Sequence, residues 1–247
     1  HCTYCLFSQL ELNVYKLQNP SYKGDVLPLK LDKFMKRTSF PPAVYMCYSS
    51  DPLGSDELKV STKKVLKKLF EHNVSILFIS KGIFDDDIID IIKTRPDLMN
   101  IQVDISSCDD KRNEFFEQGA PSYAERIKNL ERLSKIEGLD SLVVRMDPLL
   151  PNIDDTPDNI MNVLKDIKKY GVNEITTGYI VLTPGMLKSW NKHELANKVV
   201  EAMTEKTPTI SSQVLYSIPL EDKLERFKKI QRICENMGIK MSVCGCK

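Results

Sequence analysis

Residues 74–80 read Val-Ser-Ile-Leu-Phe-Ile-Ser, an almost unbroken apolar run about as long as one strand. Such a run is typical of a strand in a parallel sheet that is covered on both faces, where no alternation with polar residues is needed. Helical patterns lie on both sides of it, at about 55–72 and 85–94. The region therefore predicts a helix–strand–helix arrangement in an α/β protein.

The same alternation extends along the rest of the chain. Strands that alternate with helices form right-handed βαβ units and a parallel sheet. Five or six such units favour a barrel or partial barrel over a doubly wound sheet, and the sequence has neither GxGxxG nor GxxxxGK[ST]. Further strands are expected at 43–49, 101–106, 142–146, within 172–182 and at 239–243; further helices are expected after Ser122, after Thr156, near 190–204 and over 220–237.

Local signals define several helix ends. Ser122 and Glu125 have the spacing of a capping box, in which each side chain binds a free backbone N–H of the first turn. Thr156 followed by Pro157 is the order of an N-cap and a first helical residue. The acidic run at 85–87 is better explained by the dipole of a helix start than by a divalent metal site.

Composition limits the class of protein. The 247 residues are 42% apolar, and 35 Lys and Arg nearly balance 34 Asp and Glu, which leaves a net charge of +1. This excludes a strongly basic nucleic-acid coat protein, and no apolar run approaches the roughly 20 residues of a membrane span. Seven irregularly spaced cysteines favour a reducing compartment, so we expect a cytoplasmic protein. We expect one domain over 1–247, with about 206–247 as an accessory extension.

Both ends of the chain carry cysteine pairs. The chain opens with His1-Cys2-Thr3-Tyr4-Cys5 and closes with Cys244-Gly245-Cys246-Lys247, and we expect a fragment that is trimmed at both ends. Two thiolates three positions apart can converge on one metal, so the CxxC pattern leaves zinc, iron–sulfur and redox uses open.

Polar residues follow the expected strands. In a β/α barrel the functional residues lie at the carboxyl ends of the strands, in the loops that follow them. The sequence leaves two alternatives for these segments, a ligand-lined rim and ordinary turns at the ends of strands. They are Ser49-Ser50-Asp51, Ser80-Lys81, Ser106-Ser107, Arg145-Met146-Asp147 and Thr177-Gly178.

Several of these segments, in this order, resemble a known family. The pair Cys2 and Cys5 is similar to the second half of the CxxxCxxC motif of radical S-adenosylmethionine enzymes. The resemblance is strongest to the branch that includes the spore photoproduct lyases and their DNA repair photolyase-like relatives. The other segments that carry it are Tyr48-Ser49-Ser50-Asp51-Pro52, Ser80-Lys81, Ser106-Ser107, Glu117 to Arg126, and Asp147-Pro148-Leu149-Leu150-Pro151.

The resemblance implies a fold and a chemistry. The fold would be a partial (β/α)6 barrel whose first strand and first cluster cysteine lie upstream of His1. Cys2 and Cys5 would be two of three ligands to a [4Fe–4S] cluster, and the fourth iron would bind S-adenosylmethionine. Reductive cleavage would then give methionine and a 5′-deoxyadenosyl radical that acts on a substrate. A small flavodoxin- or ferredoxin-like protein would supply the electron.

The resemblance also implies contacts to S-adenosylmethionine. Each cationic contact has a structural alternative, because Lys81 could be a solvated strand-end charge and Arg145 could pair with Asp147. The substrate stays unassigned, and nucleic acid is implied by the resemblance alone. The implied contacts are Tyr4 for the adenine, Ser49 and Ser50 for the amino group, Lys81 and Arg145 for the carboxylate, and Ser106 for the ribose.

The C-terminal cysteines leave further alternatives open. Cys244 and Cys246 would begin the ligand set of an auxiliary iron–sulfur cluster, complete a zinc site with Cys2 and Cys5, or remain unliganded. The zinc alternative describes a non-catalytic module stapled by metal. A conventional barrel lyase or hydrolase without metal is the remaining alternative.

Overall fold

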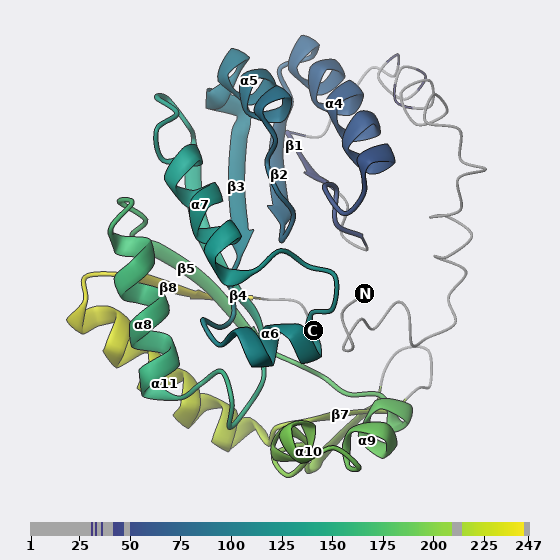
Figure 1. Ribbon diagram of the computed structural model, residues 1–247, viewed down its shortest axis with the longest axis vertical. Helices are drawn as coiled ribbons and strands as arrows, with labels where there is room; N and C mark the ends of the chain where they lie inside the picture. The colour runs from purple at the N-terminus through teal and green to yellow at the C-terminus, as the bar shows by residue number, and fades with distance from the viewer. Residues whose placement is uncertain are drawn as a thin grey trace. The chain divides into compact units, whose positions relative to one another are not determined.

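The computed structural model describes residues 31, 33, 36, 42–46, 50–208 and 214–244 (Figure 1). These residues divide into two compact units. The N-terminal unit holds the described residues up to Asp104 together with Ala120–Val143. The C-terminal unit holds Ile105–Gly119 and the described residues from Val144 onward.

The N-terminal unit is a layer of parallel strands with helices packed on it. Val44 of the first strand lies opposite Ile76 of the second, and Ile76 lies opposite Met99 of the third. Figure 1 shows α4 and α5 side by side over these strands. The elements are β1 (Ala43–Met46), α4 (Asp56–Glu71), β2 (Ser75–Ser80), α5 (Asp86–Thr94), the 3-10 helix η1 (Pro96–Leu98), β3 (Met99–Asp104) and α7 (Tyr123–Leu133).

The C-terminal unit continues the parallel pattern and adds an antiparallel hairpin. Its strands β4, β5 and β8 pair in parallel, and β6 pairs with β7 in the hairpin. Helices α8 and α11 pack against each other. The elements are α6 (Asp110–Phe116), β4 (Ser141–Leu149, which begins in the N-terminal unit), α8 (Pro157–Lys168), β5 (Glu174–Tyr179), α9 (Pro184–Trp190), α10 (Glu194–Val200), β6 (Glu205–Pro208), β7 (Val214–Ser217), α11 (Leu220–Asn236) and β8 (Lys240–Val243).

The strand order of the main sheet is β1-β2-β3-β4-β5-β8. Strands therefore follow the chain order, apart from the hairpin and helices inserted between β5 and β8. This arrangement of parallel strands with flanking helices confirms the predicted α/β class.

Local predictions about helix ends are confirmed as well. The Ser122–Glu125 capping box has both of its hydrogen bonds, and Thr156 caps α8 with Pro157 as the first helical residue. Asp85 caps α5, because its carboxylate accepts a hydrogen bond from the Ile88 N–H at 2.9 Å. The acidic run at 85–87 is thus a helix start, as the sequence predicted.

Three local predictions need correction. The helix expected near 190–204 is the shorter α10, and a separate helix that was not expected, α9, precedes it and is capped by Thr183 ahead of Pro184. The strand expected at 142–146 runs on to Leu149, because β4 shifts its register after Met146 and pairs again at Leu149. The β6–β7 hairpin was not predicted, since its four-residue strands are too short for a periodic signal.

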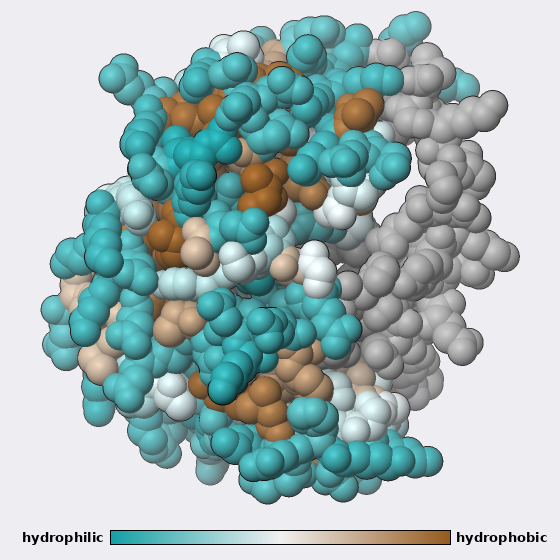
Figure 2. All heavy atoms as spheres, in the orientation of Figure 1, coloured by the Kyte–Doolittle hydropathy of each residue, from teal (hydrophilic) through white to brown (hydrophobic). Residues whose placement is uncertain are grey.

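Each unit has its own apolar core. In the N-terminal unit, Ile76 and Phe78 of β2 are fully buried together with Leu66 of α4 and Ile88 of α5. In the C-terminal unit, a cluster around Trp190 packs α9 and α10 against the segments after β4 and β5. Figure 2 shows mainly hydrophilic side chains over α4 and α5, with smaller hydrophobic areas between them. Among the described residues, no helix is both long enough and apolar enough to cross a membrane.

Gly82 lies where the loop after β2 packs closely against Leu53. A Cβ at this position would lie 2.5 Å from the Cβ of buried Leu53 and 3.0 Å from its carbonyl oxygen. We expect Gly82→Ala to lower the free energy of unfolding by about 1–3 kcal/mol, because the loop must move to admit the methyl group. Denaturant unfolding followed by circular dichroism measures the change.

Gly185→Ala is the matched control for this prediction. The Cβ that it adds in α9 meets no atom closer than the Thr183 Oγ1 at 3.8 Å. The control should leave the stability unchanged or raise it slightly, because alanine favours a helix more than glycine does. Equal stability of the two variants would contradict tight packing at Gly82.

Candidate functional site

In the N-terminal unit, Asp51 ties the loop after β1 to the end of β2. Its Oδ1 accepts hydrogen bonds from the Ser80 hydroxyl at 2.6 Å and from the Leu53 N–H at 2.8 Å. Its Oδ2 accepts from the Lys81 N–H at 2.7 Å. The Ser80 oxygen in turn accepts from the Gly82 N–H at 2.8 Å. One carboxylate thus fixes the backbone on which Lys81 stands.

Sequence reasoning assigned no role to Asp51. Part of the signal was present, because an aspartate that accepts from the N–H two residues later forms an Asx turn. The bond to Ser80 joins residues 29 positions apart, and no local pattern predicts it.

Lys81 forms an ion pair at the ends of neighbouring strands. Its ammonium lies 2.6 Å from Oδ1 of Asp104, the last residue of β3, and both side chains are largely buried. Arg126 of α7 donates to the backbone carbonyls of Pro121 and Asp104, at 2.9 and 3.3 Å. The Lys81 charge is therefore held inside the unit by a carboxylate rather than projected into solvent.

In the C-terminal unit, β4 and the residue that follows β8 bring Arg145, Asp147 and Cys244 together. The Arg145 guanidinium pairs closely with the Asp147 carboxylate and lies 3.0 Å from the Cys244 sulfur. The Cys244 N–H donates to the Thr177 carbonyl at 2.7 Å. A Cβ on Gly178 would lie 3.0 Å from the Asp147 carboxylate and 3.4 Å from the Cys244 Cβ, so glycine makes room for both.

The Ser106–Ser107 segment lies at the start of the C-terminal unit. The backbone N–H of Ile105 donates to the carbonyl of Arg145 at 2.8 Å, which fixes the segment beside β4. The Ser107 hydroxyl donates to Oδ1 of Asn159 on α8 at 2.9 Å. The Ser106 hydroxyl is fully buried and has no hydrogen-bond partner within the part of the chain that is described.

A buried ionic network lies next to this segment. Arg112 donates to both carboxylate oxygens of Asp154, at 2.9 and 2.6 Å, and also pairs with Glu117. All three side chains are fully buried. One cation thus faces two carboxylates, and burial raises the pKa of Asp154 to about 6 although Arg112 favours its ionised form.

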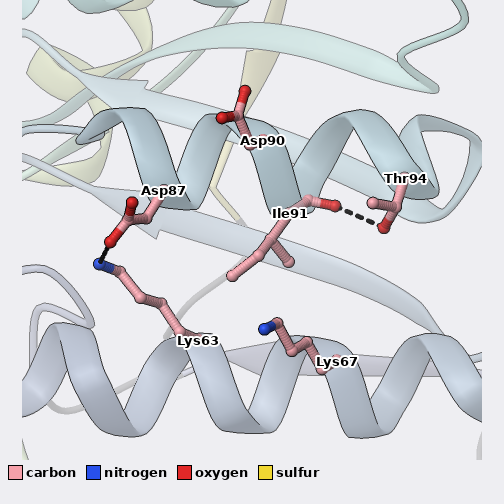
Figure 3. A pocket seen from close by; sticks show the side chains of 6 residues that line it. All are labelled: Lys63, Lys67, Asp87, Asp90, Ile91 and Thr94. Atoms are coloured by element: carbon pink, nitrogen blue, oxygen red, sulfur yellow. Dashed lines mark hydrogen bonds and ion pairs between the residues drawn. The ribbon is translucent and has the colours of Figure 1, made fainter.

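The basic residues of α4 form no comparable site. Figure 3 shows Lys63 and Lys67 on α4 facing α5, and Lys63 forms an ion pair with Asp87 at 2.7 Å. A second acid, Asp85, lies 3.3 Å from the Lys63 ammonium. The shallow depression between these helices is therefore lined by side chains of opposite charge. Such paired charges are common on an ordinary protein surface.

The predicted contacts divide between the two units. Ser50, which is half-buried, and Lys81 belong to the N-terminal unit, whereas Ser106, Arg145 and Cys244 belong to the C-terminal unit. Across the described ranges, no group of three His, Cys, Asp or Glu side chains could hold a metal ion. The predicted ligands and contacts that lie outside the described residues are Cys2, Tyr4, Cys5, Ser49 and Cys246.

Comparison with known proteins gives a fold. No protein-family model matches the chain, and no curated protein sequence does. The solved structures include spore photoproduct lyase complexed with dinucleoside spore photoproduct, which is similar at a TM-score of 0.68 and 16% identity. The similarity covers 98% of this chain and 72% of that one. This chain has the fold of spore photoproduct lyase.

Two further structures show the same architecture more distantly. A domain of a pyruvate-formate lyase-activating enzyme from Bacteroides vulgatus ATCC 8482 matches 82% of this chain and 99% of its own, at a TM-score of 0.54 and 15% identity. Streptococcus suis SuiB matches 75% of this chain and 36% of its own, at a TM-score of 0.52 and 9% identity. The partial barrel implied by the radical S-adenosylmethionine resemblance is thus confirmed as a fold.

The buried network predicts a pH-dependent stability. The pKa of Asp154 is about 6 in the folded protein, above its ordinary value of 3.8, so protonation favours the folded state. The resulting stabilisation is fully present below about pH 4 and is lost as the pH rises through 6. Relative to Asp154→Asn, the wild-type free energy of unfolding should fall by up to about 1.4 kcal/mol per pH unit across this range.

Urea unfolding at steps from pH 4 to pH 7 measures this difference. Asp158→Asn, which changes an exposed carboxylate in the first turn of α8, is the control and should keep the wild-type slope. Parallel pH profiles for the wild type and Asp154→Asn would show that the Asp154 pKa is not raised.

Proposed function

We propose that this chain is the core of a radical S-adenosylmethionine enzyme that binds a [4Fe–4S] cluster and acts on a substrate still to be identified. The observation that carries the proposal is the similarity to the spore photoproduct lyase fold over 98% of the chain. The CxxC pair Cys2 and Cys5 supports it from the sequence, because thiolates are the usual protein ligands of iron–sulfur clusters.

The described residues fit such a ligand in their chemistry. The Ser106 hydroxyl is a buried donor and acceptor, and leaving such a group unpaired costs about 1–3 kcal/mol. A ribose hydroxyl of the ligand would remove this cost. Lys81 and Arg145 are cations held in ion pairs, so a ligand carboxylate would join Asp104 or Asp147 around a charge that is already fixed.

In this proposal the protein binds and orients, and the cofactor supplies the difficult chemistry. The cluster and S-adenosylmethionine would supply one-electron and radical chemistry that amino-acid side chains lack. Asp51 would keep Lys81 in place by holding its backbone N–H. The full set of proposed contacts is Tyr4 for the adenine, Ser49 and Ser50 for the amino group, Lys81 and Arg145 for the carboxylate and Ser106 for the ribose.

The partners follow from the proposed chemistry. A small flavodoxin- or ferredoxin-like protein would donate the electron. A dinucleoside photoproduct is bound by the related lyase, whereas the near-zero net charge of this chain gives no independent support for nucleic acid. Cys244 lies next to Arg145. Metal analysis decides whether Cys244 and Cys246 bind an auxiliary cluster or a zinc ion.

Anaerobic reconstitution of the full-length protein with iron and sulfide tests the proposal. We expect brown protein with thiolate-to-iron absorbance that forms 5′-deoxyadenosine and methionine from S-adenosylmethionine under dithionite. Cys2→Ala and Cys5→Ala should each abolish both the absorbance and the products, because each removes a cluster ligand. Chromatography with mass spectrometry measures the products.

Cys234→Ala is the control, because this thiol is buried in α11. This variant should keep the cluster and the products. A colourless protein with one zinc ion would support the stapled module instead. Activity that survives Cys2→Ala and Cys5→Ala would support a barrel enzyme without metal.

A further inference from the structure

The segment after β3 is held by the side-chain amide of one residue, Asn159 on α8. Its Nδ2 donates to the Ser106 carbonyl at 3.0 Å and to the Asp154 carbonyl at 2.7 Å. Its Oδ1 accepts from the Ser107 hydroxyl at 2.9 Å and from the Cys108 N–H at 3.1 Å. The amide is buried, and both N–H donors and both lone pairs of the oxygen are used.

A second side-chain amide binds the same segment. Asn113 of α6 donates through Nδ2 to the Ser107 carbonyl at 3.1 Å. Its Oδ1 accepts from Arg112 at 3.1 Å, and Arg112 in turn binds both oxygens of Asp154. The carbonyl of Asp154 accepts from Asn159, so these side chains close a continuous buried network around the segment.

This network fixes the backbone on both sides of Ser106 but does not use its hydroxyl. The carbonyls of Ser106 and Ser107 and the N–H of Cys108 are all bound by the two asparagines. The N–H of Ile105 is bound by the Arg145 carbonyl. The Ser106 hydroxyl is completely buried and finds no partner among the residues that the structure describes.

We propose that Asn159 is a positioning residue that fixes the Ser106 hydroxyl for a sugar hydroxyl of the bound nucleoside. This inference rests on the proposed function, in which the ligand is S-adenosylmethionine. A neutral hydroxyl that can donate and accept at once pairs well with another hydroxyl, whereas a carboxylate is better matched by the cations Lys81 and Arg145. Asn159 would act only through Ser106.

Ligand affinities separate this role from a general structural one. Isothermal titration of the reconstituted full-length protein uses 5′-deoxyadenosine and methionine as separate probes. Ser106→Ala should weaken 5′-deoxyadenosine binding about three- to tenfold, the usual effect of one lost hydrogen bond. Asn159→Ala should weaken it by a similar factor, and neither variant should change the affinity for methionine.

The double variant of Ser106→Ala and Asn159→Ala gives the decisive measurement. Because Asn159 acts through Ser106, the combined change should weaken 5′-deoxyadenosine binding no more than Ser106→Ala alone. Hydrogen exchange of the amides at 105–109 should become faster in Asn159→Ala and stay unchanged in Ser106→Ala. Asn197→Ala is the control and should leave both affinities unchanged, since this half-buried asparagine of α10 donates through its side chain to Glu201 of the next turn at 3.0 Å.

Ser107→Ala is the milder variant if Asn159→Ala does not fold. It removes one of the hydrogen bonds to the amide and should weaken 5′-deoxyadenosine binding by a smaller factor, again without adding to Ser106→Ala. Additive effects, or equal losses for methionine and 5′-deoxyadenosine, would overturn the inference alone. A wild-type protein that takes up no cluster and binds neither probe would overturn the proposed function, and this inference with it.

Discussion

Burial of one face of the main sheet is the constraint on which the rest of the structure depends. Ile76 and Phe78 of β2 are fully buried, as are Ile101 of β3 and Val144 of β4. A polar side chain on that buried face needs a hydrogen-bond or ion-pair partner, because burying it without one costs free energy. In β2 and β3 the buried polar residues accordingly stand at the strand ends, at Ser80 and Asp104.

The loops at these ends are held by buried polar side chains rather than by further secondary structure. Asp51 accepts from the backbone after β2, and Asn159 binds three groups of the segment after β3. Each holder comes from a different part of the chain from the loop that it fixes. Such bonds fix the position of a loop, as the precise placement of a functional group requires.

The sequence predicts what is local and periodic, and it fails where the structure depends on distant partners. The strand at 74–80 and the capping box at Ser122 follow from runs and spacings of a few residues, and the structure has both. The hydrogen bonds from Ser80 to Asp51 and from Asn159 to Ser106 join residues 29 and 53 positions apart. No pattern in the sequence brings these pairs together. The sequence offered Asp147 as a partner of Arg145, two residues away, and the structure has this pair. The Asp104 partner of Lys81 is 23 positions away and emerges only from the folded arrangement.

These ion pairs bear on the kind of ligand that the strand ends suit. Lys81 is neutralised by Asp104 and Arg145 by Asp147, each within one unit. A polyanion would gain little from cations already bound to carboxylates, and it would be repelled by Asp104 and Asp147. An amino-acid headgroup carries one ammonium and one carboxylate, so it can place each charge beside the opposite member of a pair. These pairs would therefore suit the zwitterionic amino-acid group of the proposed ligand, S-adenosylmethionine, better than they would suit a nucleic-acid backbone.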